Sequence, residues 1–345
     1  MQIEIKQELA FGHRWPVAEL RAALSGARKT VLVAHLNADG DAVGSVAGMA
    51  AALRLTTTGR VTAMLPDGVP DDLRWLPGTD GILSGRDDAD RCADAIAEAD
   101  LVVALDVSTL DRTGVLAEKL KASKAGKILI DHHIGPDAGQ FGLMISEPDA
   151  SSTCELVFWA MRLCFGDAAL DRDAATCLYT GICTDTGTFS YSNDRPSVYT
   201  AAALLLAYGI DPMAINRNIR NVFTTERLRF FGHAADTLMT VYGRQRVALV
   251  VIHASDMEAY GVKSADLTGL INEVMRLHDI DCGILVREEP PTVRLSLRSK
   301  EIYDVNQLAR DLFGGGGHER AAGATSTLTL DETVARVKEK LQLER

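Results

Sequence analysis

Short apolar runs alternate with helical patterns through the first half of the chain. Segments with helical spacing, such as residues 42–55 and 89–99, separate four strand candidates, which are TVLVAH (30–35), VTAML (61–65), LVVALD (101–106) and KILID (127–131). Strands that alternate with helices pack as a parallel sheet covered on both faces. The pattern therefore predicts an α/β fold with a doubly wound parallel sheet in the N-terminal half.

Histidine and aspartate residues follow three of these strands. His35 closes the first strand, with Asp39 and Asp41 just beyond it, Asp106 ends the run LVVALD, and residues 131–133 (DHH) end KILID. One aspartate after a strand more often caps a helix or forms a turn, and Asp106 alone would favour that interpretation. Because the carboxyl ends of parallel strands meet at one edge of a sheet, the three sets together predict a metal site.

The residue types also indicate which metal fits. Oxygen and imidazole ligands without thiolate favour Mn²⁺, Mg²⁺ and similar ions. Asp185, in TGICTDTGTF, would join Asp39, Asp41 and Asp106 as a fourth carboxylate if it reaches the same edge. Two divalent cations neutralise about four such charges, generate hydroxide at neutral pH and hold a phosphoryl group for in-line attack.

The second half of the chain has a different character. Residues 197–240 predict a helical connector, with short helices at 197–208 and 212–220 and a longer one near 224–240. A second, smaller α/β pattern begins at RVALVVIHAS and includes the alternating strand TVRLSLRSK. A chain of 345 residues is long enough for two cores. We therefore expect a metal-binding domain at 1–196, a connector at 197–240 and a second, smaller domain at 241–345.

The stretch FGGGGHERAAG and a nearby strand suggest an anion site in this second domain. Consecutive glycines expose backbone N–H groups to a phosphate, which makes Gly316, Gly317 and His318 candidates, although a flexible turn is the better explanation for a glycine run by itself. Arg294 and Arg298 stand four residues apart on an alternating strand and therefore share a face. Such a pair suits phosphate recognition, and a solvated charged face is the alternative.

A helix start is predicted in front of the apolar run CELVFWAM. Ser151, Ser152 and Thr153 precede it, and Glu155 falls in its first turn. This pattern is typical of a helix N-terminal cap. Contact of these residues with a phosphate is the less favoured interpretation.

Charge and cysteine usage narrow the partners and the compartment. A net charge of −11 disfavours tight binding to long nucleic acid. The six cysteines are scattered without a C-x-x-C pair, as expected of buried free thiols in a reducing compartment. Residues 1–15 lack the apolar core of a signal peptide, and no apolar run reaches the ~18 residues of a membrane span. We expect a cytoplasmic protein without membrane partners.

Together these motifs resemble those of the DHH phosphoesterases. The triplet DHH at 131–133 resembles the one that gives the family its name, and GGGGHERAAG resembles the glycine-rich signature of the associated DHHA1 domain. The family's remaining metal motifs are matched in the same order by His35, Asp39, Asp41, Asp106 and Asp185. Within the family, the sequence is most similar to the stand-alone nano-RNase and pAp-phosphatase branch, which is cytoplasmic and manganese-dependent.

The resemblance implies a role for each of these residues. His35 and Asp39 would hold one metal ion, and Asp106 would bridge it to a second ion. The second ion would be held by Asp41, His132 and Asp185. Asp131 would orient an imidazole, and His133 would contact the scissile phosphate or act as an acid. The substrate's far phosphate would be bound by Arg298, Gly316, Gly317 and His318.

The resemblance also implies an activity. Two divalent ions, with Mn²⁺ expected and Mg²⁺ or Co²⁺ as alternatives, would support hydrolysis of very short oligonucleotides such as pApA to 5′-mononucleotides, and of pAp to AMP and phosphate. Alternatives are a cyclic-dinucleotide phosphodiesterase, an inorganic pyrophosphatase-like hydrolase and, from another class, a non-catalytic nucleotide sensor. The family suggests a homodimer, although no stretch of the sequence indicates one.

Overall fold

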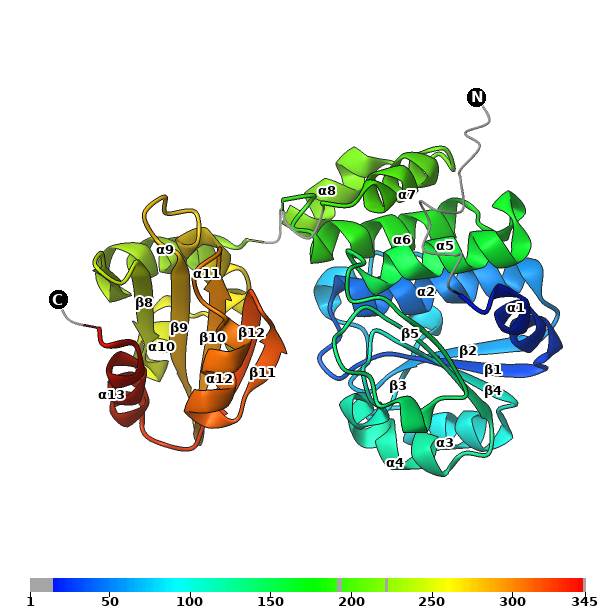
Figure 1. Cartoon of the computed structure of the whole chain (residues 1–345), viewed down its shortest axis with the longest axis horizontal. Coiled ribbons are helices and arrows are strands. Elements are labelled where there is room, and N and C mark those ends of the chain that lie inside the picture. Colours follow the sequence, from blue (N-terminus) through cyan, green and yellow to red (C-terminus); the bar gives the residue numbers. More distant parts are fainter. Residues whose placement is uncertain (1–14, 191–193, 221–222, 344–345) are drawn as a thin grey trace. The chain divides into compact units, whose positions relative to one another are not determined.

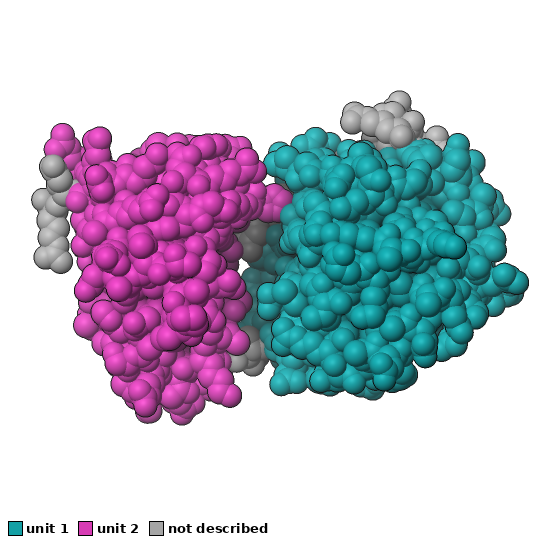
Figure 2. Space-filling model, turned by 90° about the horizontal axis from the view of Figure 1, so that it is seen from below, with its two compact units in different colours: residues 1–222 teal, residues 223–345 magenta. Residues whose placement is uncertain are grey.

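The computed structural model describes residues 15–190, 194–220 and 223–343. The chain divides into two compact units, residues 1–222 and 223–345, which are coloured separately in Figure 2. Most of the N-terminal stretch on which the signal-peptide prediction rests lies outside the described residues. Within them, no helix has both the length and the apolar composition needed to cross a bilayer.

Unit 1 contains a sheet of six parallel strands in the order β3-β2-β1-β4-β5-β6. The strands are β1 (Lys29–Val33), β2 (Arg60–Leu65), β3 (Leu83–Ser84), β4 (Leu101–Leu105), β5 (Gly126–Asp131) and β6 (Leu143–Ser146). The four longest are the four that the sequence predicts, so the doubly wound parallel sheet is confirmed. The strand order reverses between β1 and β4, and in such sheets ligands bind outside the carboxyl ends of the strands at this switch point.

Helices cover both faces of this sheet (Figure 1). On one face, α2 (Gly40–Thr56) and α5 (Thr153–Phe165) contact the sheet, and α1 (Val17–Gly26) and α6 (Arg172–Asp185) pack on these helices in the larger core. The other face packs against α3 (Ala89–Glu98) and α4 (Ala117–Ala122). Because both faces are covered, every residue of β4 is buried, which explains its unbroken apolar sequence.

Glycines four residues apart let α2 and α6 approach closely. Gly40, Gly44 and Gly48 lie on the face of α2 that meets α6. A Cβ at Gly44 would stand 2.6 Å from the carbonyl oxygen of Cys177, and one at Gly48 would stand 2.7 Å from the side chain of Leu178. Side chains larger than hydrogen would therefore force the helices apart. The contact brings the start of α2 beside the end of α6. This consequence of the glycine spacing was not predicted from the sequence.

Unit 2 contains a mixed six-stranded sheet in the order β11-β12-β10-β9-β8-β7, in which β8 and β9 alone pair in parallel. Its strands are β7 (Met239–Tyr242), β8 (Val247–Ile252), β9 (Cys282–Glu289), β10 (Thr292–Ser299), β11 (Gly316–His318) and β12 (Ala321–Ser326). One face packs against α12 (Val305–Phe313) and α13 (Leu330–Leu341). The other packs against α9 (Thr225–His233), α10 (Ala254–Tyr260) and α11 (Leu270–Val274).

The helices predicted as a connector are shared between the two units. Helices α7 (Pro196–Leu206) and α8 (Pro212–Arg220) belong to unit 1, whereas α9 belongs to unit 2. The longer helix predicted near 224–240 is wrong at its end, because α9 gives way to a π-helical turn at Ala234–Leu238 and then to β7. Antiparallel pairing with β8 draws this end of the segment into the sheet.

All six cysteines are buried free thiols, as predicted. Burial and the nearby Asp41 raise the pKa of the Cys154 thiol well above its usual range.

Candidate metal centre

The predicted ligands converge at the carboxyl edge of the unit 1 sheet, where the strand order reverses. His35 lies two residues beyond β1, Asp106 directly follows β4, and Asp131 is the last residue of β5. The register pairs Val33 with Ala104 in the neighbouring strand, so His35 and Asp106 occupy equivalent positions. Asp106 has a φ of 57°, in the left-handed region that few residues other than glycine adopt, and this turns the chain at the strand end.

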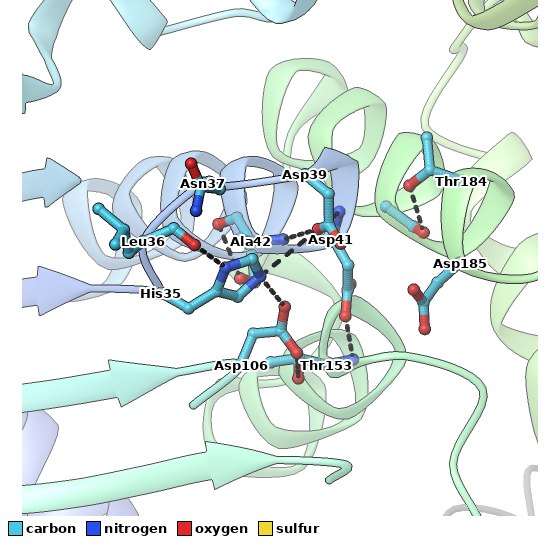
Figure 3. Close-up of polar contacts among 12 residues, drawn as sticks. His35, Leu36, Asn37, Asp39, Asp41, Ala42, Asp106, Thr153, Thr184 and Asp185 are labelled. Atoms are coloured by element: carbon cyan, nitrogen blue, oxygen red, sulfur yellow. Dashed lines mark hydrogen bonds and ion pairs between the residues drawn. The ribbon is translucent and has the colours of Figure 1, made fainter. Parts of the chain in front are cut away.

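The two oxygens of the Asp106 carboxylate face different imidazoles. Oδ2 lies 3.2 Å from Nε2 of His35 (Figure 3). Oδ1 lies 3.6 Å from Nε2 of His132. The His35 nitrogen is also 3.8 Å from Oδ1 of Asp39. Asp106 is therefore placed between two groups of candidate ligands, as a bridging carboxylate in a two-metal site would be.

The second group of ligands surrounds His132. Its Nε2 lies 3.4 Å from Oδ2 of Asp185 and 3.9 Å from Oδ2 of Asp41. Asp185 is the last residue of α6 and Asp41 lies in the first turn of α2, so the close packing of these helices joins the two carboxylates at one site. This arrangement brings Asp185 to the same edge as the strand-end residues.

Backbone carbonyl groups fix the ring orientation of both imidazoles. Nδ1 of His35 lies 2.9 Å from the carbonyl oxygen of Leu36, and Nδ1 of His132 lies 3.3 Å from that of Ala150. A carbonyl oxygen only accepts hydrogen bonds, so Nδ1 carries the proton in both rings. In the neutral ring, the Nε2 lone pair then points at carboxylates, an unfavourable contact that a cation between them makes favourable.

The electrostatics of the cluster indicate the same need for cations. Burial and neighbouring carboxylates raise the pKa values of Asp41 and Asp185 well above their usual range. Burial opposes ionisation of Asp106, but its hydrogen bond to His35 and the nearby imidazoles lower its pKa. Burial would lower the pKa of His35, yet Asp106 and Asp39 raise it to about 9. The cluster thus retains protons to offset its negative charge, and divalent cations would replace them.

The third histidine is held by a carboxylate. Nδ1 of His133 lies 2.8 Å from Oδ1 of Asp131 and 3.4 Å from Oδ1 of Asp106. Asp131 is fully buried, and its second oxygen has no hydrogen-bond partner among the described residues. A carboxylate in this position orients the imidazole ring and fixes its tautomer.

Two helix starts hold two of the candidate ligands. Oδ1 of Asp39 accepts hydrogen bonds from the N–H groups of Asp41 and Ala42, so this residue caps α2 while facing His35. The two oxygens of Asp41 accept hydrogen bonds from the N–H groups of Thr153 and Cys154 in the first turn of α5, at 2.7 and 2.8 Å. Free N–H groups and the positive end of the helix dipole both stabilise a carboxylate there.

The predicted cap of α5 is confirmed, because Oγ of Ser152 accepts the N–H of Glu155 at 3.1 Å. The sequence did not predict that the first turn of α5 donates hydrogen bonds to the candidate metal ligand Asp41. The sequence SSTC shows where the helix starts but not which distant carboxylate its N–H groups meet.

In unit 2, the candidate substrate residues share one sheet face. The β10 residues Arg294 and Arg298 alternate with buried apolar residues, as predicted. Arg298 pairs in register with Ala321 of β12, which pairs in turn with His318 of β11. Residues directly opposite one another in antiparallel strands share a face, so Arg298 and His318 flank a small alanine. Arg294 stands four residues earlier on β10, and its Nε lies 3.6 Å from Oε2 of Glu289.

The glycine run is used differently from the expectation that its N–H groups are open. The N–H groups of Gly314 and Gly315 bond to carbonyl oxygens at the end of α12, and that of Gly317 bonds to Oδ1 of Asn306 at 3.1 Å. A Cβ at Gly317 would stand 2.4 Å from the carbonyl oxygen of Ala321. Close pairing with β12 explains these glycines, so side chains are the better candidates for binding a phosphate.

Comparison with known proteins identifies the family. Residues 29–182 match the DHH family, N-terminal domain, and residues 243–343 match the DHHA1 domain. The chain is 30% identical over 336 residues to the bifunctional oligoribonuclease and PAP phosphatase NrnA of Thermus thermophilus, covering 95% of this chain and 93% of that protein. The chain therefore belongs to the DHH family, and the predicted resemblance is confirmed.

Further relatives agree with this assignment. The protein of the same name from Bacillus subtilis is 25% identical, with 86% of this chain and 88% of the relative covered. An exopolyphosphatase-related protein from Bacteroides fragilis has the same fold, with a TM-score of 0.90, 30% identity and 99% and 98% coverage. RecJ from Thermus thermophilus, solved in complex with Mn²⁺, shares the fold at a TM-score of 0.55 and 14% identity, covering 95% of this chain and 54% of RecJ.

Proposed function

We propose that this chain is a phosphoesterase that uses two divalent metal ions, Mn²⁺ in the first place, to hydrolyse very short oligonucleotides to 5′-mononucleotides and pAp to AMP and phosphate. The observation that carries the proposal is the Asp106 carboxylate, with one oxygen toward each of two groups of ligands. Membership of the DHH family and the names of relatives with nearly full coverage support the choice of substrates.

The donors on each side of Asp106 fit two ions. His35 and Asp39 would complete one ligand group with Asp106. The other group would combine Asp106 with Asp41, His132 and Asp185. When bound, the two ions would activate water and offset the charge of the phosphoryl group. All these donors are oxygen or imidazole nitrogen, which suits Mn²⁺ and also accommodates Mg²⁺ or Co²⁺.

The pair formed by Asp131 and His133 would act on the substrate itself. Asp131 accepts the hydrogen bond from Nδ1 of His133, so Nε2 is the nitrogen that would meet the scissile phosphate. In that position His133 would donate a hydrogen bond to a phosphate oxygen or a proton to the leaving group. Asp131 would keep the ring in the required tautomer.

Unit 2 would recognise the other end of the substrate. Arg298 would pair with a phosphate, and His318, across the small Ala321, would donate a second hydrogen bond. Arg294 would contribute less, because Glu289 already neutralises part of its charge. Gly316 and Gly317 would keep the strand edge narrow enough for a nucleotide to approach.

The proposal is tested by incubating purified protein with Mn²⁺ and pApA and following AMP by chromatography. We expect prompt AMP release that ends when EDTA is added, and AMP with phosphate from pAp. Pyrophosphate, cyclic di-AMP and a long single strand are the comparison substrates. Faster turnover of pyrophosphate or cyclic di-AMP than of pApA would replace the proposed substrate class. Binding of nucleotide with no turnover of any of these substrates would favour the sensor.

A further inference from the structure

We propose that Thr153 is a positioning residue that ties two metal-binding carboxylates, Asp41 and Asp106, into the arrangement that accepts a second metal ion. This inference rests on the proposed two-metal function. It concerns a residue whose sequence context predicts only a helix start.

Thr153 makes a separate hydrogen bond to each carboxylate. Its backbone N–H donates to Oδ2 of Asp41 at 2.7 Å, and its hydroxyl donates to Oδ1 of Asp106 at 3.1 Å. The residue is fully buried, so water does not compete for these bonds. Thr153 thus links Asp41, in the first turn of α2, with Asp106, which directly follows β4. The two aspartates are 65 residues apart in the chain.

The position of Thr153 at the first residue of α5 makes the hydroxyl available for this contact. Within helices, a threonine hydroxyl commonly bonds to the carbonyl four residues earlier, as Oγ1 of Thr180 does with Thr176 at 2.8 Å. Thr153 has no earlier turn of its own helix to bond. Ser152 supplies the N-terminal cap through Glu155, so the Thr153 hydroxyl is not needed for that purpose.

The hydroxyl bonds to the oxygen of Asp106 that faces the second ligand group. That oxygen, Oδ1, lies 3.6 Å from Nε2 of His132, and the other oxygen faces His35. A carboxylate oxygen has two lone pairs, so it can accept this hydrogen bond and still bind a metal. Without the bond, the carboxylate is free to rotate and place both oxygens on one ion. The expected consequence is selective weakening of the second metal site.

The test compares Mn²⁺ binding by Thr153→Val, Thr153→Ser and the matched control Thr180→Val with binding by the unaltered protein. Electron paramagnetic resonance of free Mn²⁺ gives the binding isotherm, and the spin-coupled signal reports the paired ions. We expect Thr153→Val to keep one tight site and to bind the second ion about 10- to 100-fold more weakly, with loss of the coupled signal. Thr153→Ser and Thr180→Val should bind as the unaltered protein does.

The outcomes separate this inference from the proposed function. If the unaltered protein does not bind two Mn²⁺ ions, the two-metal function itself fails. If it binds two ions and Thr153→Val does so with equal affinity and an intact coupled signal, the positioning role of Thr153 is wrong. If Thr153→Val does not fold, as judged by circular dichroism, Thr153→Ala removes the same hydroxyl without adding a methyl group and decides the question by the same isotherm.

Discussion

The two units hold their candidate functional groups in opposite ways. In unit 1, Asp41, Asp106 and Asp131 are at most 2% exposed, and hydrogen bonds from helix starts and imidazoles fix their carboxylates. In unit 2, by contrast, the Arg294 side chain is 48% exposed. Buried charges are tolerated only when they are paired, so their geometry is set before a ligand arrives. Exposed side chains can adjust, and we expect them to contribute to binding more than to the chemical step.

The largest expected effect is that of Asp106→Asn. The amide keeps the size of the side chain but loses the charge between the two ligand groups. We expect kcat on pApA to fall on the order of 10³-fold, beyond the 10–100-fold typical of residues that only support ligands. The measurement is steady-state AMP release at saturating Mn²⁺. Asp167→Asn, which breaks a surface ion pair with Arg162, is the control and should retain activity. Equal activity of the two variants would show that Asp106 is not part of the active site.

The second test compares a tightly packed glycine of unit 1 with an open one of unit 2. A Cβ on Gly181 would stand 2.2 Å from Sγ of Cys154 and 3.0 Å from Oδ1 of Asp41. We expect Gly181→Ala to lower the free energy of unfolding by about 1–3 kcal/mol. Gly232 in α9 has open space around it, so Gly232→Ala should be neutral or stabilising by up to about 1 kcal/mol. Urea unfolding of both variants measures the difference, and equal midpoints would contradict the packing argument.

In unit 2, Arg298→Gln should separate binding from chemistry. Losing one charge-assisted contact to a phosphate costs about 1.5–3 kcal/mol, so we expect KM for pApA to rise about tenfold or more while kcat changes little. Initial rates over a range of pApA concentrations give both constants. Arg276→Gln, at an exposed ion pair with Glu273, is the matched control. A fall in kcat with unchanged KM would place Arg298 in the chemical step and break the contrast between the units.

A further expected effect is the pH dependence of metal binding to unit 1, which changes the affinity gradually and does not abolish a step. In the metal-free protein, His35 stays protonated up to a pKa of about 9, and Mn²⁺ must displace that proton. Raising the pH removes the competing proton, so Mn²⁺ affinity should increase by up to about tenfold per pH unit and level off near pH 9. Calorimetry in two buffers of different ionisation enthalpy counts the protons released. His35→Asn should release fewer protons, and release that is unchanged in this variant would exclude His35 as a ligand.

The hydrogen bonds that join distant segments of the chain could not be predicted from the sequence. The fragment SSTC identified the start of α5 correctly, but the contacts of Thr153 with Asp41 and Asp106 depend on where α2, α5 and β4 meet. The glycine run looked open in the sequence, whereas in the structure β11 pairs with β12 and Oδ1 of Asn306, in α12, accepts the N–H of Gly317. The end of the helix expected near 224–240 was also predicted wrongly. Residues 239–242 pair with β8, and a local sequence pattern does not show which distant strand is available for pairing.

The sequence by itself determined the parallel sheet of unit 1 and the edge at which its ligands gather. Apolar runs that alternate with helices can be buried in few ways, and the carboxyl ends of parallel strands necessarily share an edge, so His35, Asp106 and Asp131 could be brought together by reasoning alone. Only the tertiary structure decided which oxygen of Asp106 faces which histidine. That choice depends on side-chain rotation, and rotation is fixed by hydrogen bonds from segments far away in the chain.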